Sequence, residues 1–219
     1  MAISKTWSYN YADRCECSDD DRCGCSYPEN MAHGYTSQIT RQVRSAYEYN
    51  HARVGEQALN FVAPAVLADG NIDENFNFFN YIADTNALLI FYRADFSAIC
   101  PEEIIGFNQA ADEFKNRNIK LVAVSVDSVQ AHQAWRKIPY AQGGIGNVSF
   151  PLVSDTARQA GLAYGVLRPD GMTQRASFFI DRNLKIRYQA VYDRRLKRNT
   201  HETLRVIDML LGVEKADYN

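Results

Sequence analysis

Cysteines are the residues in this sequence whose chemistry is most readily identified. The chain has five of them. Four lie within eleven residues in the spacing C-x-C-x5-C-x-C, as Cys15, Cys17, Cys23 and Cys25, whereas Cys100 stands alone. A cluster and one isolated thiol indicate two separate chemistries. Clustered thiols suit metal binding or disulfide exchange, and an isolated thiol can serve as a catalytic nucleophile.

Cys100 is expected at the start of a helix. Pro101 follows it, and proline favours the first helical position. The helix is predicted over residues 101–116, because apolar residues recur there at helical spacing: Ile104, Phe107, Ala111 and Phe114. Unpaired N–H groups and the positive end of the helix dipole favour the thiolate form there. The negative charges of Glu102 and Glu103 disfavour the thiolate form unless nearby cations balance them. The alternative is a buried structural cysteine.

Strands and helices alternate from about residue 52 onward. Short apolar runs predict buried strands at 87–92 and 120–126. Helices are predicted at 128–137, capped by Ser128, and at 156–164. A hairpin is predicted from strands 177–180 and 186–191. The order of these elements indicates a layered α/β domain.

The two ends of the chain differ in pattern. Asn199 and Glu202 have capping-box spacing, and they predict a last helix over 204–211 that stops at Gly212. Residues 1–51 are polar, and their apolar residues follow neither the helical nor the strand spacing over any length. They are therefore predicted to form an irregular N-terminal extension. The chain therefore divides into a Cys-rich extension, 1–51, and a folded domain, 52–219.

The composition is that of a soluble globular protein, with 46% hydrophobic and 23% charged residues. The net charge of −2 does not indicate the positive electrostatic potential that nucleic-acid binding requires. No apolar run has the length of a membrane span, and the first residues lack the apolar stretch of a signal peptide. We therefore expect a cytoplasmic protein without nucleic-acid or membrane partners. Cysteines in that compartment are more often catalytic or metal-binding than paired in disulfides.

The residues around Cys100 carry a family resemblance. Residues 91–103, FYRADFSAICPEE, resemble the peroxidatic loop of the typical two-cysteine peroxiredoxins, the alkyl hydroperoxide reductase C and thiol-specific antioxidant family, whose usual pattern is FYPLDFTFVCPTE. Further matches follow in order at Ser125–Ser128, His132, Trp135, Gly143–Gly146, Asp155, Tyr164–Leu167, Arg175, Phe178–Asp181 and Glu202–Arg205. The resemblance implies a thioredoxin-like fold, with a central mixed sheet flanked by helices.

The resemblance also implies an activity, that of a thiol peroxidase for hydrogen peroxide and organic hydroperoxides. Cys100 matches the peroxidatic cysteine, which becomes a sulfenic acid, and Ser97 matches the hydroxyl that holds the peroxide. Arg175 matches the arginine that polarises both groups. Glu103 matches the carboxylate that orients the arginines, and Arg198 matches a second arginine of that network. No cofactor is needed for this chemistry. The implied partners are a thiol reductant, such as a thioredoxin-like protein, and further copies of the chain in a homodimer or a ring of dimers.

Two departures from the family pattern bear on the mechanism. Arg93 stands where the family has proline, and no cysteine follows Cys100, so the expected C-terminal resolving cysteine is absent. These departures favour an alternative function as a redox sensor, chaperone or structural protein with little turnover. The N-terminal cluster has three interpretations: a zinc site of Cys15, Cys17, Cys23 and Cys25, a source of resolving thiols for Cys100, or an exposed loop that does neither.

Overall fold

The computed structural model describes residues 51–193 and 195–217. Residues 1–50 of the predicted extension, with its four cysteines, lie outside these ranges. Within the described part of the chain, seven strands form one sheet in the order β2-β1-β5-β4-β3-β6-β7. The strands are β1 Val62–Val66, β2 Ile72–Asn77, β3 Asn86–Phe91, β4 Ile119–Ser125, β5 Leu152–Ser154, β6 Ala176–Ile180 and β7 Ile186–Val191.

The sheet is mixed, as predicted, and β3 lies inside it. β3 runs parallel to β4 and antiparallel to β6. All six of its residues are buried. Leu88 and Ile90 pack on one face of the sheet, whereas Leu89 and Phe91 pack on the other. This two-residue alternation explains why the sequence of β3 is apolar without a break, since both faces are covered by other elements.

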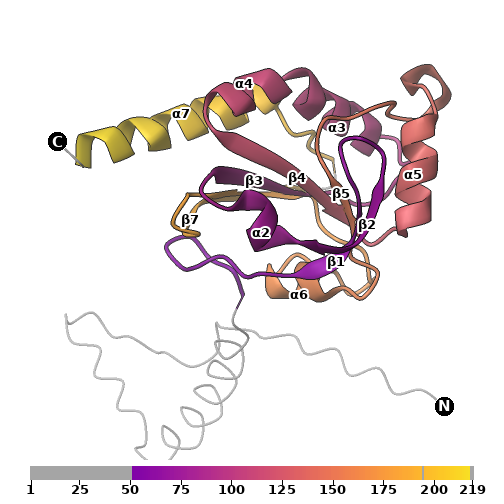
Figure 1. Ribbon diagram of the computed structural model, residues 1–219, viewed down its shortest axis with the longest axis horizontal. Coiled ribbons are helices and arrows are strands. Elements are labelled where there is room, and N and C mark those ends of the chain that lie inside the picture. Colours follow the sequence, from indigo (N-terminus) through magenta and orange to yellow (C-terminus); the bar gives the residue numbers. More distant parts are fainter. Residues whose placement is uncertain (1–50, 194, 218–219) are drawn as a thin grey trace, which may run out of the picture. The chain divides into compact units, whose positions relative to one another are not determined.

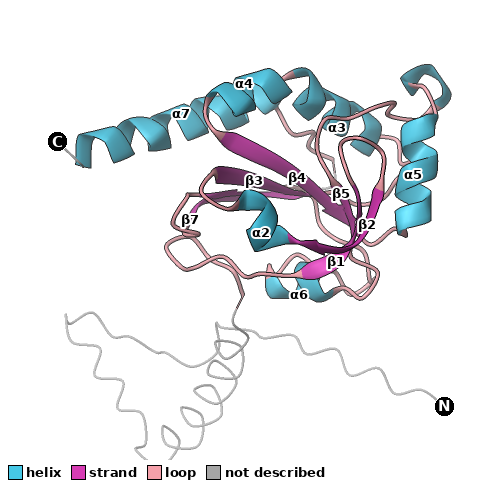
Figure 2. Cartoon of the chain, in the orientation of Figure 1, coloured by secondary structure: helices cyan, strands magenta, loops and turns pink. Residues whose placement is uncertain are grey.

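Helices cover both faces (Figures 1 and 2). The helices are α2 Phe78–Ile82, α3 Cys100–Gln109, α4 Ala111–Asn116, α5 Val129–Lys137, α6 Gln159–Ala163 and α7 Thr200–Asp217. α3, α5 and α7 pack against the face of Leu88, through Ile104, Trp135 and Ile207. α2 and α6 pack against the other face. The predicted α/β layering and thioredoxin-like arrangement are confirmed.

Three helix predictions were wrong in extent, and one of them, over 156–164, is the shorter α6 at Gln159–Ala163. The helix predicted over 101–116 is two helices, α3 and α4, which meet at Ala110. The last helix does not stop at Gly212 but continues to Asp217. A glycine inside a helix costs only about 1 kcal/mol relative to alanine, so the surrounding sequence can carry the helix through it. Asn199 does accept hydrogen bonds from the N–H groups of His201 and Glu202, as a cap should.

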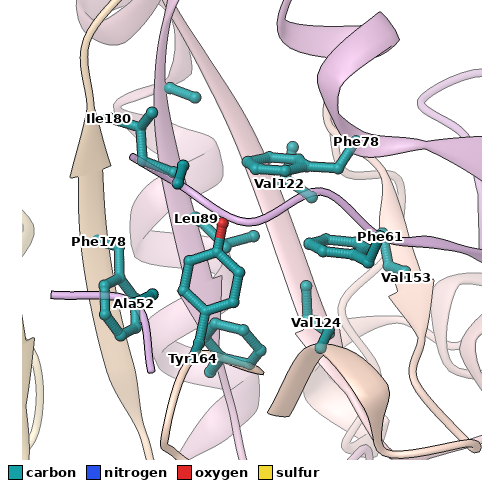
Figure 3. Packing of buried hydrophobic residues seen from close by; sticks show 14 of the residues in the cluster. Ala52, Phe61, Phe78, Leu89, Val122, Val124, Val153, Tyr164, Phe178 and Ile180 are labelled. Carbon is teal, nitrogen blue, oxygen red and sulfur yellow. The ribbon is translucent and has the colours of Figure 1, made fainter. Parts of the chain in front are cut away.

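Tyr164 places one polar group inside the core beside α6 (Figure 3). Its ring packs edge-on against Phe178, with ring centroids 5.0 Å apart. Its hydroxyl donates a 2.8 Å hydrogen bond to the carbonyl oxygen of Leu59 and accepts one of 3.2 Å from the N–H of Leu59. Burial raises the pKa of Tyr164 well above its usual value. The hydroxyl therefore fastens the segment that leads into β1 onto the core.

Removal of this hydroxyl should destabilise the fold. We expect Tyr164→Phe to lower the free energy of unfolding by about 1–3 kcal/mol, because the two backbone groups of Leu59 lose their partner. Urea denaturation measures this difference. Tyr140→Phe is the matched control, since the side chain of Tyr140 is exposed. Equal stability of the two variants would contradict the prediction.

Candidate active site

Cys100 is the first residue of α3, as the sequence predicts. The loop 92–99 leads to it from the end of β3, and the N-cap position is Ile99, which makes no side-chain cap. The side chain of Cys100 is buried, with 1% of the residue exposed. Its N–H donates to Oγ of Ser97 at 3.4 Å. The loop thus brings the hydroxyl of Ser97 to the backbone N–H of Cys100, the two residues that the sequence singled out.

A buried polar cluster holds the loop in place. Asp95 accepts a 2.8 Å hydrogen bond from the hydroxyl of Tyr92, and its other oxygen lies 2.8 Å from Nδ1 of His132 on α5. The N–H of Asp95 donates to a carboxylate oxygen of Asp127, after β4. Burial, followed by the charge of Asp95, raises the pKa of Tyr92 well above its usual value. Four polar residues from three parts of the chain therefore fix the loop that carries Ser97.

Glu103 lies one helical turn after Cys100 and is held by two arginines. Oε1 of Glu103 lies 2.8 Å from Nη1 of Arg175. Oε2 accepts hydrogen bonds from Nε and Nη2 of Arg198, at 3.1 and 2.9 Å. The three residues are 5–7% exposed. From the sequence, the charge of Glu103 was expected to need nearby cations, and in the structure Arg175 and Arg198 are these cations.

Other donors of the two guanidinium groups reach backbone oxygens. Nη1 of Arg198 bonds to the carbonyl oxygens of Phe91 and Ala176, at 3.0 and 3.1 Å. Nη2 of Arg175 bonds to the carbonyl oxygen of Asp193 at 2.8 Å. The cluster therefore joins α3 to the end of β3 and the start of β6. Two guanidinium groups against one carboxylate leave a net positive charge next to the helix that begins at Cys100.

The other sequence-based candidates lie apart from this cluster or outside the described residues. Arg93 is exposed. The N–H of Met172, and after it the charges of Arg168 and Arg93, hold the pKa of Asp170 below its usual range. Cys15, Cys17, Cys23 and Cys25 are not among the described residues. Within the ranges that are described, no group of three or more His, Cys, Asp or Glu side chains is arranged to hold a metal ion. No helix among these residues has the length and apolar character of a bilayer span.

Sequence reasoning missed the role of the Asp95 cluster. It named His132 only among the family matches, whereas the ring is fully buried and lies between Asp95 and the carbonyl oxygen of Val153. The available signal was the presence of an aspartate, Asp95, in the loop between a buried strand and the helix of Cys100. A buried carboxylate needs hydrogen-bond partners, and a histidine on a neighbouring helix is a suitable one.

Comparisons with known proteins agree with this geometry. The family model described as the AhpC/TSA family matches residues 54–189. Alkyl hydroperoxide reductase C of Buchnera aphidicola subsp. Acyrthosiphon pisum is 44% identical over 158 residues, which are 72% of this chain and 80% of that protein. Alkyl hydroperoxide reductase C of Helicobacter pylori is 38% identical over 162 residues, 74% of this chain and 82% of that protein. The reduced crystal structure of the Plasmodium vivax 2-Cys peroxiredoxin is similar with a TM-score of 0.71 and 40% identity, over 74% of this chain and 83% of that one.

Glu103 should be the most sensitive residue of the ion-pair cluster. We expect Glu103→Gln to lower the free energy of unfolding by about 3 kcal/mol, because two buried guanidinium groups lose their counter-charge. Glu102→Gln is the matched control, since Glu102 is the preceding residue and its side chain is 55% exposed. Urea denaturation compares the two, and a loss for Glu103→Gln no larger than that of the control would contradict the prediction.

Proposed function

Because the chain belongs to the AhpC/TSA family, we propose that Cys100 is the residue with which it reduces peroxides. The protein is a thiol-dependent peroxidase, and its relatives are alkyl hydroperoxide reductases and peroxiredoxins. The alternative of a sensor, chaperone or structural protein with little turnover is not favoured by these relationships. The observation that carries the assignment to Cys100 is its position at the start of α3, beside Ser97.

The proposed reaction begins with the thiolate of Cys100. The sulfur attacks one peroxide oxygen, the O–O bond breaks, and the cysteine becomes a sulfenic acid while an alcohol or water leaves. Cys100 lies at the positive end of the α3 dipole, and the arginine cluster beside the same helix carries a net positive charge. The same positive charge stabilises the negative charge that develops on the departing oxygen.

We assign roles to the neighbours of Cys100 on the same basis. Ser97 holds the peroxide, since its hydroxyl lies at the N–H of Cys100. Arg175 and Arg198 supply positive charge and hydrogen-bond donors. Glu103 positions both guanidinium groups, because its two oxygens accept from both of them. No cofactor enters this reaction scheme.

The assignment predicts which residue peroxide oxidises. One equivalent of hydrogen peroxide added to the reduced protein should convert Cys100 to a sulfenic acid within minutes, as located by peptide mass spectrometry after trapping with dimedone. Cys100→Ser should abolish this peroxide consumption, because the nucleophile is lost.

The control keeps Cys100 and replaces the four N-terminal cysteines with serine. It should react with the first equivalent at the rate of the unchanged protein. Unmodified Cys100 in that control would refute the assignment.

A second thiol condenses with the sulfenic acid to give a disulfide and water, and a further thiol then reduces this disulfide and returns Cys100 to the thiol state. We propose that a thiol reductant, such as a thioredoxin-like protein, does this. Within the 219 residues, a resolving thiol can come only from Cys15, Cys17, Cys23 or Cys25. The same four thiols fit a tetrahedral zinc site, which is the assignment that we favour, since all-thiolate ligand sets suit zinc.

Elemental analysis of protein purified without chelator distinguishes these roles. We expect about one zinc per chain, lost in a Cys15→Ser/Cys25→Ser variant, because a structural site needs four ligands. A metal-free protein that forms a disulfide between Cys100 and an N-terminal peptide on oxidation would contradict the zinc site and establish the resolving role.

Three further proposals have their support in the sequence alone. They are a cytoplasmic location, a division of the chain into 1–51 and 52–219, and assembly into homodimers or rings of dimers. The composition of the chain, with its polar stretch over residues 1–51, supports the first two. The family resemblance of the sequence supports the third.

A further inference from the structure

We propose that Arg93 selects, among organic hydroperoxides, those that carry a carboxylate. The guanidinium binds the carboxylate while the hydroperoxide group of the same molecule reaches Cys100. This preference rests on the proposed role of Cys100, whereas the effect of the Arg93 charge at the sulfur can be measured without any peroxide. The usual pattern of the family has proline at this position, so the shared reaction does not account for a cation here.

Arg93 lies at the start of the loop that leads to Cys100. It is exposed, whereas the preceding residue, Tyr92, packs in the same hydrophobic cluster as Cys100. Ser97 follows four residues later and accepts from the N–H of Cys100. Four residues of chain span at most about 14 Å, so the backbone of Arg93 lies no farther than this from Ser97. An alkyl chain with a polar group at each end can therefore reach both residues.

A second segment, the turn 168–172, lies beside the start of the loop. Its two flanking residues, Leu167 and Thr173, form a β-bridge. The hydroxyl of Thr173 donates a 2.5 Å hydrogen bond to the carbonyl oxygen of Tyr92, directly before Arg93. This hydrogen bond is buried, so the turn is fastened to the loop at that point. The charged side chains of the turn therefore lie near the charge of Arg93.

The charges of the turn and of Arg93 sum to a positive value. Arg168 and Asp170 pair within the turn, with 3.3 Å between Nε and Oδ2. The N–H of Met172, and after it the charges of Arg168 and Arg93, hold the pKa of Asp170 below its usual range, so this carboxylate is ionised at neutral pH. Within the described part of the chain, Arg93 forms no ion pair of its own, and Asp170 acts on it only at longer range. Two arginines thus face one carboxylate, which favours an anion that arrives from solvent.

Apart from its arginine, the exposed surface of the loop 92–99 is mainly apolar. Phe96 is 52% exposed, and its ring packs on Trp135 with the ring centroids 6.1 Å apart. Asp95, the only carboxylate in the sequence of the loop, is buried and accepts from the hydroxyl of Tyr92. A ligand bound by the arginine of the loop therefore meets apolar surface and no exposed negative charge of the loop, which suits a hydrocarbon chain.

These features fit an organic hydroperoxide with an alkyl chain between its hydroperoxide group and a carboxylate. The thiolate sulfur of Cys100 takes the terminal OH, the O–O bond breaks, and the alkoxide leaves and takes up a proton from water. The carboxylate does not react. It holds the molecule at Arg93, whose guanidinium can offer two parallel hydrogen bonds. An oxidised free fatty acid has this chemistry, whereas the same chain esterified in a lipid has no carboxylate.

The main test compares two peroxides that differ in charge. One is tert-butyl hydroperoxide with one methyl group extended to an alkyl chain that ends in a carboxylate, and the other is the methyl ester of this compound. The measured quantity is the ratio of the rates at which the carboxylate and the ester oxidise Cys100 in a single turnover of the reduced full-length protein, by rapid quench and peptide mass spectrometry. The ratio removes any general effect of a substitution on the thiolate, because both peroxides react with the same sulfur.

The unchanged protein should oxidise faster with the carboxylate than with the ester. Arg93→Gln should lower the ratio about two- to fivefold, the size typical of one exposed ion pair. Asp170→Asn should raise it, because Arg168 and Arg93 then have no carboxylate between them. Arg182→Gln is the matched control and should leave the ratio unchanged, since Arg182 is exposed and lies just beyond the end of β6 opposite to Arg175. In 1 M sodium chloride the preference should largely disappear.

A second measurement needs no peroxide. Iodoacetate and iodoacetamide have similar size, and only iodoacetate carries a charge, so the ratio of their rates of alkylation of Cys100 reports the electrostatic potential at the sulfur. Arg93→Gln should lower this ratio, Asp170→Asn should raise it, and Arg182→Gln should leave it unchanged. If peroxide fails to oxidise Cys100 in the unchanged protein, the proposed function falls, and this ratio still decides whether Arg93 attracts anions to the site.

Three results would overturn the proposal. The first is equal ratios for Arg93→Gln and Arg182→Gln in either measurement. The second is a fall of the ratio in both Arg93→Gln and Asp170→Asn, because a change of charge must act with opposite signs in these two variants. The third is an unchanged protein that reacts no faster with the carboxylate than with the ester.

Discussion

A buried carboxylate between two guanidinium groups is the interaction on which the site depends. Glu103 accepts from Arg175 and Arg198, and other donors of these arginines reach carbonyl oxygens at the end of β3, at the start of β6 and at Asp193. Buried charges are tolerated only when their hydrogen bonds are satisfied, so these segments have little freedom to move apart. This cluster can form because β3 and β6 are neighbours in the sheet.

A second buried cluster constrains the other end of the loop. Asp95 binds Tyr92 and His132 at one end of the segment 92–99, and Glu103 binds the arginines just beyond its other end. Between them, Phe96 has a φ of 54°, which a bulky residue rarely adopts. The loop is therefore fixed at both ends, and a local backbone conformation of that kind can persist because the surroundings determine it. The position of Ser97 relative to Cys100 follows from these two anchors.

Much of this fold could be predicted from the sequence, because its central elements have strong local signals. The apolar run of β3 and the serine cap of α5 both predicted the observed elements. The missed strands have weak signals: β1 contains a proline, β2 is mostly polar, and β5 has three residues. They are strands because they pair with neighbours, and pairing with distant segments leaves little trace in local sequence. The break between α3 and α4 likewise had no signal such as glycine or proline at Ala110.

In the site, too, some residues could be placed from the sequence and others could not. The position of Cys100 could be predicted from Pro101 and the helical period, since both are local. The burial of Arg175 and Arg198 could not, because an arginine is ordinarily exposed and several of their partners here are backbone oxygens far away in sequence. The family resemblance identified these residues by their order along the chain, and the structure supplies the physical reason for their burial. Sequence similarity therefore indicated which residues belong together, while only the three-dimensional arrangement shows what satisfies their charges.

The burial of each ion pair determines how strongly it holds the active-site helix. An interior pair such as Glu103 and Arg198 holds the active-site helix in one position, and solvent cannot screen it. An exposed pair such as Glu102 and Lys197 contributes less and responds to its surroundings. Glu102 and Glu103 are adjacent in one helical turn, yet only Glu103 can fix the position of α3, because its partners lie in the interior.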